Sequence, residues 1–134
     1  MLKCQIPNFK SLKVDKLVFD YNGTLACDGT PIKGVKEKLD QLSESFDIYI
    51  LTADTFGTVE SKFSDVEAEI SIIDSKDGTA AKEEFVQQLG SEQVIALGNG
   101  NNDALMLEEA KVGILIFGPE GAATKSLFKS DLVI

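Results

Sequence analysis

Short runs of apolar residues alternate along most of this chain with stretches of helical periodicity. The runs are rich in valine, isoleucine, leucine and phenylalanine, which is typical of strands covered on both faces of a parallel sheet. We therefore expect six strands, at residues 13–20, 47–52, 68–73, 93–98, 112–117 and 131–134. Because helical stretches separate them, the pattern predicts an α/β fold with a doubly wound, mainly parallel, Rossmann-like sheet.

The helical stretches show apolar residues at steps of three and four. The apolar stripes predict three helices, one with Val35, Leu39, Leu42 and Phe46, one with Phe85, Val86 and Leu89, and one with Leu105, Met106 and Ala110. A fourth short helix is expected at residues 120–128. Asp54 is interpreted as the cap of a helix that begins near Thr55, with a place beside the functional site as the alternative.

Two segments fall outside the strand–helix alternation. Asp28-Gly29 is a strong signal for a two-residue hairpin turn, so residues 25–32 are expected to form a small β-flap over the end of the first strand. The residues before Val14 indicate another short strand or hairpin, with Pro7-Asn8 at its turn.

The length of 134 residues predicts a single domain, residues 1–134, with one core. No apolar run approaches the roughly 20 residues that a membrane span needs, and no signal-peptide pattern follows Met1. Cys4 and Cys27 form neither a CxxC pair nor a spacing typical of metal ligands. These absences predict a cytoplasmic protein with no membrane partner.

The charge composition excludes several classes of function. A net charge of −9 argues against nucleic acid as a partner, because phosphate backbones are bound by clustered cations. All thirteen basic residues are lysine, so the chain has no guanidinium to clamp a phosphate. It also has no histidine, which excludes Ser-His-Asp triads and histidine-ligated zinc.

Polar residues follow several predicted strands at their carboxyl ends. Asp20 and Asn22 follow the first strand, Thr52 and Ala53 the second, and the stretch 98–103 the fourth. In an open α/β sheet, ligands bind beyond the carboxyl ends of the strands, where the strand order reverses. We therefore expect these residues to share one site.

The residue types at these positions favour phosphate chemistry. An aspartate held at a strand end can attack phosphorus, while N–H groups of the following turn, including that of Gly23, meet phosphate oxygens. Thr52 and the N–H of Ala53 can donate to the same oxygens. Lys82 supplies the charge that offsets a phosphoryl group, with Lys76 as a competitor for this role.

The same site offers a set of oxygen donors for Mg²⁺. The predicted ligands are Asp20, the main-chain carbonyl of Asn22, Asn99 and Asp103. Carboxylate and carbonyl oxygens are the ligands that Mg²⁺ prefers, and water completes its octahedral shell. The predicted cofactor is therefore Mg²⁺.

Four segments resemble the four motifs of the haloacid dehalogenase (HAD) superfamily, in their usual order and over nearly the whole chain: 20–25, 52–54, Lys82 and 98–103. The likeness is greatest to the phosphorylation domain of P-type ATPases, whose nucleophile motif also lacks an acid two residues on, and to small soluble P-type ATPase-like hydrolases. The resemblance implies a Mg²⁺-dependent hydrolase of the phosphatase type that acts on a phosphoester or acyl-phosphate through an aspartyl-phosphate on Asp20.

Two residues depart from the family pattern. Asn22 stands where most phosphatases of the family have a general acid, a group worth roughly 10²–10⁴-fold in rate. Asn99 stands where the family usually has a metal-binding aspartate, so one negative charge is lost. Both changes predict a phosphatase of low intrinsic activity, or one whose phosphoenzyme lives long enough to be a signal.

The spacing of the motifs leaves no room for a cap or a nucleotide-binding domain, so a capless site is expected. The resemblance to capless relatives favours a homo-oligomer in which a neighbour covers the open site. The expected partner is a small phosphorylated substrate or a phosphoprotein. Two alternatives to an active enzyme remain: an inactive phosphate-binding regulatory module, and a phosphorylation domain that acts with a partner.

Overall fold

The computed structural model describes residues 1–73 and 75–134. Its centre is a six-stranded parallel sheet with the strand order β10-β9-β8-β3-β6-β7. The strands are β3 (Lys16–Asp20), β6 (Asp47–Thr52), β7 (Glu69–Ile72), β8 (Val94–Gly98), β9 (Val112–Leu115) and β10 (Leu132–Val133). The predicted doubly wound α/β sheet is confirmed.

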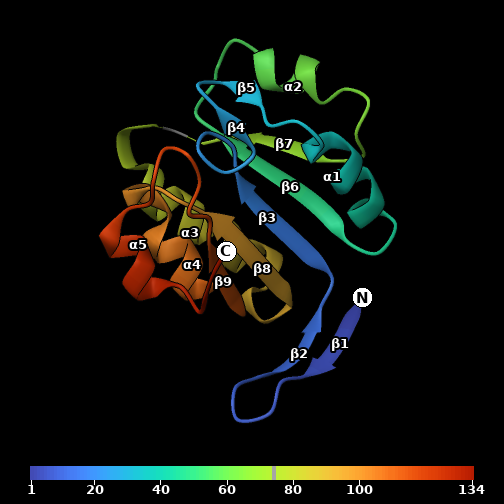
Figure 1. The fold of residues 1–134 in the computed structure, drawn as a ribbon, viewed down its shortest axis with the longest axis vertical. Helices are drawn as coiled ribbons and strands as arrows, with labels where there is room; N and C mark the ends of the chain where they lie inside the picture. Colours follow the sequence, from blue (N-terminus) through green and yellow to red (C-terminus); the bar gives the residue numbers. More distant parts are fainter. Residues whose placement is uncertain (74) are drawn as a thin grey trace.

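Helices cover both faces of this sheet (Figure 1). Their bounds are α1 (Val35–Ser43), α2 (Thr58–Lys62), α3 (Gly78–Leu89), α4 (Ala104–Glu109) and α5 (Thr124–Lys129), with 3-10 turns at Ser75–Asp77, Ser91–Gln93 and Asn101–Asp103. Leu39 of α1 and Phe63 after α2 pack with the flap on one face, whereas Val86 of α3 and Met106 of α4 pack on the other. The sheet is therefore buried on both sides, as its continuous apolar strands require.

Two small antiparallel hairpins lie outside the sheet. The flap consists of β4 (Ala26–Cys27) and β5 (Thr30–Pro31), and it stands over the carboxyl end of β3 as predicted. The N-terminal hairpin consists of β1 (Leu2–Gln5) and β2 (Ser11–Val14), and it extends from the opposite end of the sheet (Figure 1). The predicted hairpin before Val14 is thus confirmed.

Three sequence predictions need correction. The expected strand 13–20 is broken at Asp15, because residues up to Val14 pair with β1 while Lys16 enters the central sheet. The helix expected at 120–128 begins only at Thr124, because Gly118 and Gly121 close a turn before it. The helix expected near Thr55 begins at Thr58. No helix in the described part of the chain is long and apolar enough to cross a membrane.

Candidate active site

The strand order reverses at β3, and the predicted site residues gather at the carboxyl end of this strand and its neighbours. Asp20 is the last residue of β3 and Thr52 the last of β6, and both are largely buried. Asn99 follows β8 directly. These three residues line one hollow of about 380 Å³, as expected for polar residues at a topological switch point.

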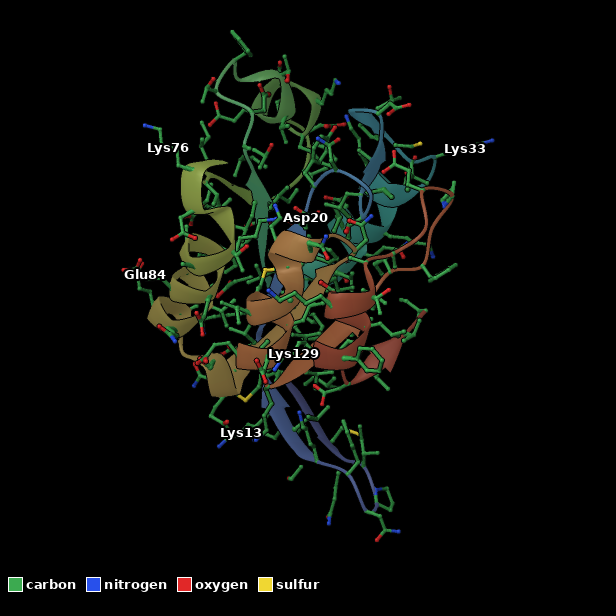
Figure 2. The ribbon with its side chains drawn as sticks, turned by 90° about the vertical axis from the view of Figure 1, so that its left-hand side faces the viewer. Lys13, Asp20, Lys33, Lys76, Glu84 and Lys129 are labelled. Atoms are coloured by element: carbon green, nitrogen blue, oxygen red, sulfur yellow. The ribbon has the colours of Figure 1, made fainter. Side chains whose placement is uncertain are left out.

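Lys82 is the only cation that the described residues bring into contact with Asp20. Its Nζ donates to Asp20 Oδ1 at 2.6 Å and to Asp103 Oδ1 at 2.7 Å, and the whole lysine is only 4% exposed. Helix α3 places it there, with Asp77 capping the helix start through its contact with the N–H of Ala80. Lys76 lines the same hollow, but Figure 2 shows its side chain pointing outward, away from Asp20. Of the two candidate lysines, Lys82 is therefore the one that contacts Asp20, and its predicted binding of phosphate stays a prediction.

Burial and neighbouring charges shift the pKa of Asp20 and the pKa of Lys82. Burial and the neighbouring charge of Asp103 raise the pKa of Asp20 to about 7, although Lys82 opposes the shift. Burial lowers the pKa of Lys82, but the charges of Asp20 and Asp103 outweigh it and the net shift is upward. Lys82 therefore stays charged, and its charge limits the rise in the pKa of Asp20 that burial and Asp103 cause.

Asp103 lies behind the hollow rather than in its wall. It is fully buried, and Lys82 occupies its Oδ1. Its Oδ2 accepts from the main-chain N–H groups of Asn99 and Gly100, both at 2.9 Å. Asp103 thus holds the lysine on one side and the loop after β8 on the other. Its predicted role as a metal ligand stays a prediction.

Helix α5 holds the same loop from its other side. The N–H of Ala123 donates to the carbonyl of Asn99 at 2.8 Å. The hydroxyl of Ser126, which is completely buried, donates to the carbonyl of Gly100 at 2.5 Å. The backbone on which Asn99 stands is therefore held on both sides. The sequence of α5 did not indicate this contact.

The loop after β6 is arranged by Asp54. The carboxylate of Asp54 accepts from the N–H groups of Phe56, Thr58 and Val59. Asp54 therefore caps the first N–H groups of α2 as interpreted, although the residue at the N-cap position of that helix is Gly57. The N–H of Asp54 in turn donates to Thr52 Oγ1 at 3.1 Å. That bond uses only a lone pair of the oxygen, and the Thr52 hydroxyl donates to no residue that the structure describes, so its hydrogen can donate into the hollow.

Asn22 connects the site to the flap. Its side chain is exposed, and its Oδ1 accepts from the N–H of Gly29 at the flap turn, at 3.1 Å. The carbonyl of Gly29 accepts from the Tyr21 hydroxyl at 2.8 Å and from Lys62 Nζ at 2.6 Å. Sequence reasoning missed this anchoring, because Lys62 lies 33 residues away from Gly29.

Gly23 makes room for Asn99. Its φ of 82° lies in the left-handed region, and a Cβ on Gly23 would come within 2.1 Å of the Asn99 side-chain nitrogen. The N–H of Gly23 donates to the carbonyl of Ala26 at 2.7 Å. This N–H is therefore already engaged inside the turn, and the predicted phosphate contact of Gly23 stays a prediction. In this conformation Gly23 shapes the cradle of Asn99.

Three of the four predicted metal ligands face the hollow. Asp20, Asn22 and Asn99 line it, as does Ala53 beside Thr52. A separate group, Cys27 with Asp28 and Glu120, brings one donor atom each to within 4.8 Å of one another at the flap, and the Cys27 thiol donates to Glu120. The sequence did not indicate this group, because Glu120 is far from Cys27 and Asp28 in the chain and comes from the loop after β9.

Solved phosphatases share this arrangement of strands and helices. A cobalt-bound deoxy-D-mannose-octulosonate 8-phosphate phosphatase of Haemophilus influenzae matches 90% of this chain and 77% of its own, with a TM-score of 0.73 and 13% identity. The 3-deoxy-D-manno-octulosonate 8-phosphate phosphatase of Moraxella catarrhalis was solved with magnesium, phosphate and KDO. The match covers 90% of this chain and 76% of that phosphatase, with a TM-score of 0.66 and 18% identity. The match to an apo phosphoserine phosphatase covers 91% of this chain and 94% of that phosphatase, with a TM-score of 0.70 and 15% identity.

These structures are phosphatases of the HAD superfamily. The chain has the HAD fold. Between Asp20 and Thr52 the structure holds only the flap, α1, strand β6 and their connecting turns, so the expectation of a capless fold fits. The greater likeness to P-type ATPases is not confirmed and stays a prediction.

Two curated proteins of Methanocaldococcus jannaschii resemble parts of this chain. The uncharacterized protein MJ0073 is 44% identical over 52 residues, which are 39% of this chain and 56% of that relative. The uncharacterized protein MJ0072 is 54% identical over 39 residues, which are 29% of this chain and 89% of that relative. The chain belongs to the same family as MJ0072. No protein-family model matches the chain.

Proposed function

We propose that the protein is a Mg²⁺-dependent phosphohydrolase that works through an aspartyl-phosphate on Asp20. The observation that carries the proposal is the 2.6 Å contact between Lys82 Nζ and Asp20 Oδ1 in the hollow that Thr52 also lines. A buried cation beside a buried carboxylate opposes the rise in the pKa of that carboxylate, which favours the ionised nucleophile, and it offers positive charge to an arriving phosphoryl group. The HAD phosphatases of the same fold support the reaction class.

The reaction would proceed in two displacements. An oxygen of Asp20 attacks phosphorus and forms a new O–P bond, while the bond to the leaving oxygen breaks and its electron pair departs with that oxygen. Thr52 and Lys82 hold the remaining phosphoryl oxygens during this step. Water then attacks phosphorus and forms a new O–P bond, while the bond between phosphorus and the Asp20 oxygen breaks and its electron pair stays with the carboxylate. Inorganic phosphate leaves, and the proton of the attacking water passes to solvent.

The residues in the hollow fit a Mg²⁺ ion. Asp20, the main-chain carbonyl of Asn22 and the amide oxygen of Asn99 are hard oxygen donors, and the cradle beside Gly23 is shaped to the Asn99 side chain. When bound, the ion offsets the negative charge that carboxylate and phosphate bring together. Asp103 is the weakest of the predicted ligands, because both its oxygens already accept hydrogen bonds.

Asn22 sets the expected rate and the substrate class. An amide neither protonates a leaving group nor activates water, so substrates whose leaving group departs unprotonated are favoured. Phenolic phosphates and acyl-phosphates have this property. The open hollow places no cap between the substrate and solvent, which suits a small phosphate ester or a phosphorylated protein side chain.

The test is release of phosphate from a phenolic phosphate ester with Mg²⁺. We expect slow release by the wild-type protein and none by Asp20→Asn. Asp28→Asn is the matched control, since it removes the same charge from an exposed flap residue at a φ of 47° that asparagine tolerates. Equal release by all three proteins would refute the proposal.

A phosphate-binding module without turnover is the second candidate. The hydrogen bond from the N–H of Gly29 to Asn22 Oδ1 favours this second candidate. The side chain at the usual general-acid position here holds the flap and is not available for proton transfer. Beryllium fluoride with Mg²⁺ separates the two candidates, since it mimics an aspartyl-phosphate only where nucleophile and metal site are competent. Thermal stabilisation by phosphate but not by beryllium fluoride would support the module.

A further inference from the structure

Positive charge is concentrated in the N-terminal hairpin. Residues 1–14 hold three of the thirteen lysines and none of the twenty-two acidic residues. The rest of the chain therefore carries ten lysines against twenty-two acids. The hairpin extends from this acidic body at the end of the sheet opposite the flap (Figure 1).

The outer face of the hairpin presents two unpaired lysines. Lys3 and Lys13 are direct cross-strand partners, so their side chains share one face of the ribbon. Neither forms an ion pair with any residue that the structure describes. Figure 2 shows Lys13 pointing away from the body. Like charges placed directly opposite each other destabilise a strand pair, so an anionic partner on this face would stabilise the hairpin.

The hairpin also lacks the packing that would stabilise it alone. All four residues of β1 are exposed, and Leu12 and Val14 of β2 provide its buried apolar contacts. An isolated two-stranded hairpin is marginally stable in water, and its unpaired edge can bind another chain. A hollow of about 410 Å³ lies over the ribbon, lined by Lys3, Cys4, Gln5, Ser11, Leu12 and Lys13.

An acidic hollow lies next to the base of this hairpin. It has a volume of about 370 Å³ and includes Asp47, Glu67 and Glu69 at the amino ends of β6 and β7. All three acids are exposed, and none is in an ion pair within residues 1–73 and 75–134. The N-terminal amine donates to the carbonyl of Ser45 at 3.0 Å, which places the start of β1 beside this hollow.

We propose that these two surfaces form a dimer of the chain about a two-fold axis. The Lys3 and Lys13 face of each copy docks on the acidic hollow of the other. Two adjacent patches of opposite sign suit this symmetry, because a two-fold axis makes each contact occur twice. The occupant is a second copy because the chain itself supplies the complementary charge. The dimer uses the amino end of the sheet and leaves the hollow at Asp20 open.

The experiment measures association by sedimentation at low and high salt. The wild-type protein is expected to be a dimer at low salt and to dissociate near 1 M salt, where the screening length falls to about 3 Å. Lys3→Glu/Lys13→Glu is expected to raise the dimer dissociation constant by about 10²-fold or more, because like charges then face each other across the interface. Glu67→Lys/Glu69→Lys is expected to do the same.

Mixing the two charge-reversed proteins supplies the decisive result. Each is expected to be monomeric alone, and an equimolar mixture is expected to form a heterodimer, because both contacts are then again of opposite sign. Lys33→Glu/Lys125→Glu is the control for net charge: both lysines are exposed and lie outside the two surfaces, so the dimer should persist. Circular dichroism confirms that every variant is folded.

Several results would overturn the dimer. A wild-type protein that sediments as a monomer at low salt refutes it, and so does a mixture that stays monomeric. A monomer whose hairpin lysines retain it on an immobilised polyanion would assign the face to a different partner. Phosphatase activity plays no part in any of these outcomes, so the dimer and the proposed function fail separately.

Discussion

The two ends of the central sheet handle charge in opposite ways. At the carboxyl end, Lys82 is buried between Asp20 and Asp103, with both contacts shorter than 2.8 Å. At the amino end, Lys3 and Lys13 share an exposed face near an acidic hollow, and the two surfaces do not meet within the chain. Buried charges are paired because an unpaired one is costly, whereas exposed charges can remain unpaired in water.

This difference suggests that the two ends have different roles, one in a reaction and one in binding a partner. A buried, mutually paired cluster has fixed geometry and perturbed proton affinity, which are properties of a reaction site. An exposed cluster lacks this fixed geometry, but it attracts a partner of opposite charge. The following changes test whether the two ends are independent, beginning with the largest expected effect.

Replacing Lys82 tests the buried cluster most severely. Lys82→Met leaves two buried carboxylates without their cation, so we expect a loss of about 3–5 kcal/mol in the free energy of unfolding. The rate of phosphate release should fall by roughly 10²–10³-fold or more, because the phosphoryl charge is no longer offset. Urea denaturation and a phenolic phosphate assay measure the two effects.

Lys76→Met is the matched control for this change, since Lys76 lines the same hollow but points outward. It should change the rate only a few-fold. Equal losses in the two variants would mean that the buried contact with Asp20 has no special part in the reaction.

Replacing Asn22 tests the assignment of the missing acid. Asn22→Asp keeps an oxygen that can accept from the N–H of Gly29, so the flap should stay in place. Turnover of an alkyl phosphate should rise by about 10²-fold, at the low end of general-acid effects, and turnover of a phenolic phosphate should rise much less. The same increase on both substrates would show that Asn22 has another role.

Two glycine substitutions separate backbone strain from the metal site. Gly23 and Gly29 have φ values of 82° and 75°, so alanine at either should cost about 1–2 kcal/mol. Only at Gly23 would the new Cβ displace the Asn99 side chain, whereas nothing lies within 4 Å at Gly29. We expect the two variants to unfold alike, with Gly23→Ala alone requiring more Mg²⁺ for half-maximal activity.

The raised pKa of Asp20 predicts a pH-dependent effect on stability. Between pH 4 and 7 the folded protein binds the Asp20 proton more tightly than the unfolded chain, so wild-type stability from this group falls as the pH rises toward the folded pKa of about 7. Asp20→Asn removes this loss. In the presence of a chelator, the variant should therefore gain stability over wild type at pH 8, and the gain should shrink toward pH 5. Thermal melts across this range measure it.

The sequence predicted the central sheet well because its strands are buried on both faces. Strand β6 matches the predicted range, since its apolar run ends at a polar loop. The single strand predicted at 13–20 was wrong, because this run belongs to two strands, β2 and β3. The break at Asp15 arises because β2 pairs with β1, which the apolar pattern of the run does not indicate. The short helix α2 gave little periodicity, and the Asp54 cap is what indicated it.

Most of the predicted site residues line one hollow, but the sequence did not predict their contacts. Position after a strand end placed Asp20, Thr52 and Asn99 correctly around one hollow. The sequence did not reveal that Asp103 turns to Lys82 and to the loop backbone, because that depends on how α3 packs against α4. It also missed the contact of Ser126 with Gly100, since a serine in a short helix carries no chemical signal.

The central claim is that Asp20 becomes phosphorylated, and mass spectrometry of the protein incubated with acetyl phosphate and Mg²⁺ tests it most directly. After acid quenching, we predict one added phosphoryl group on a peptide containing Asp20, lost on treatment with hydroxylamine and absent without Mg²⁺. The same addition in Asp20→Asn, or stable phosphorylation confined to a hydroxyl such as that of Thr24, would contradict the account.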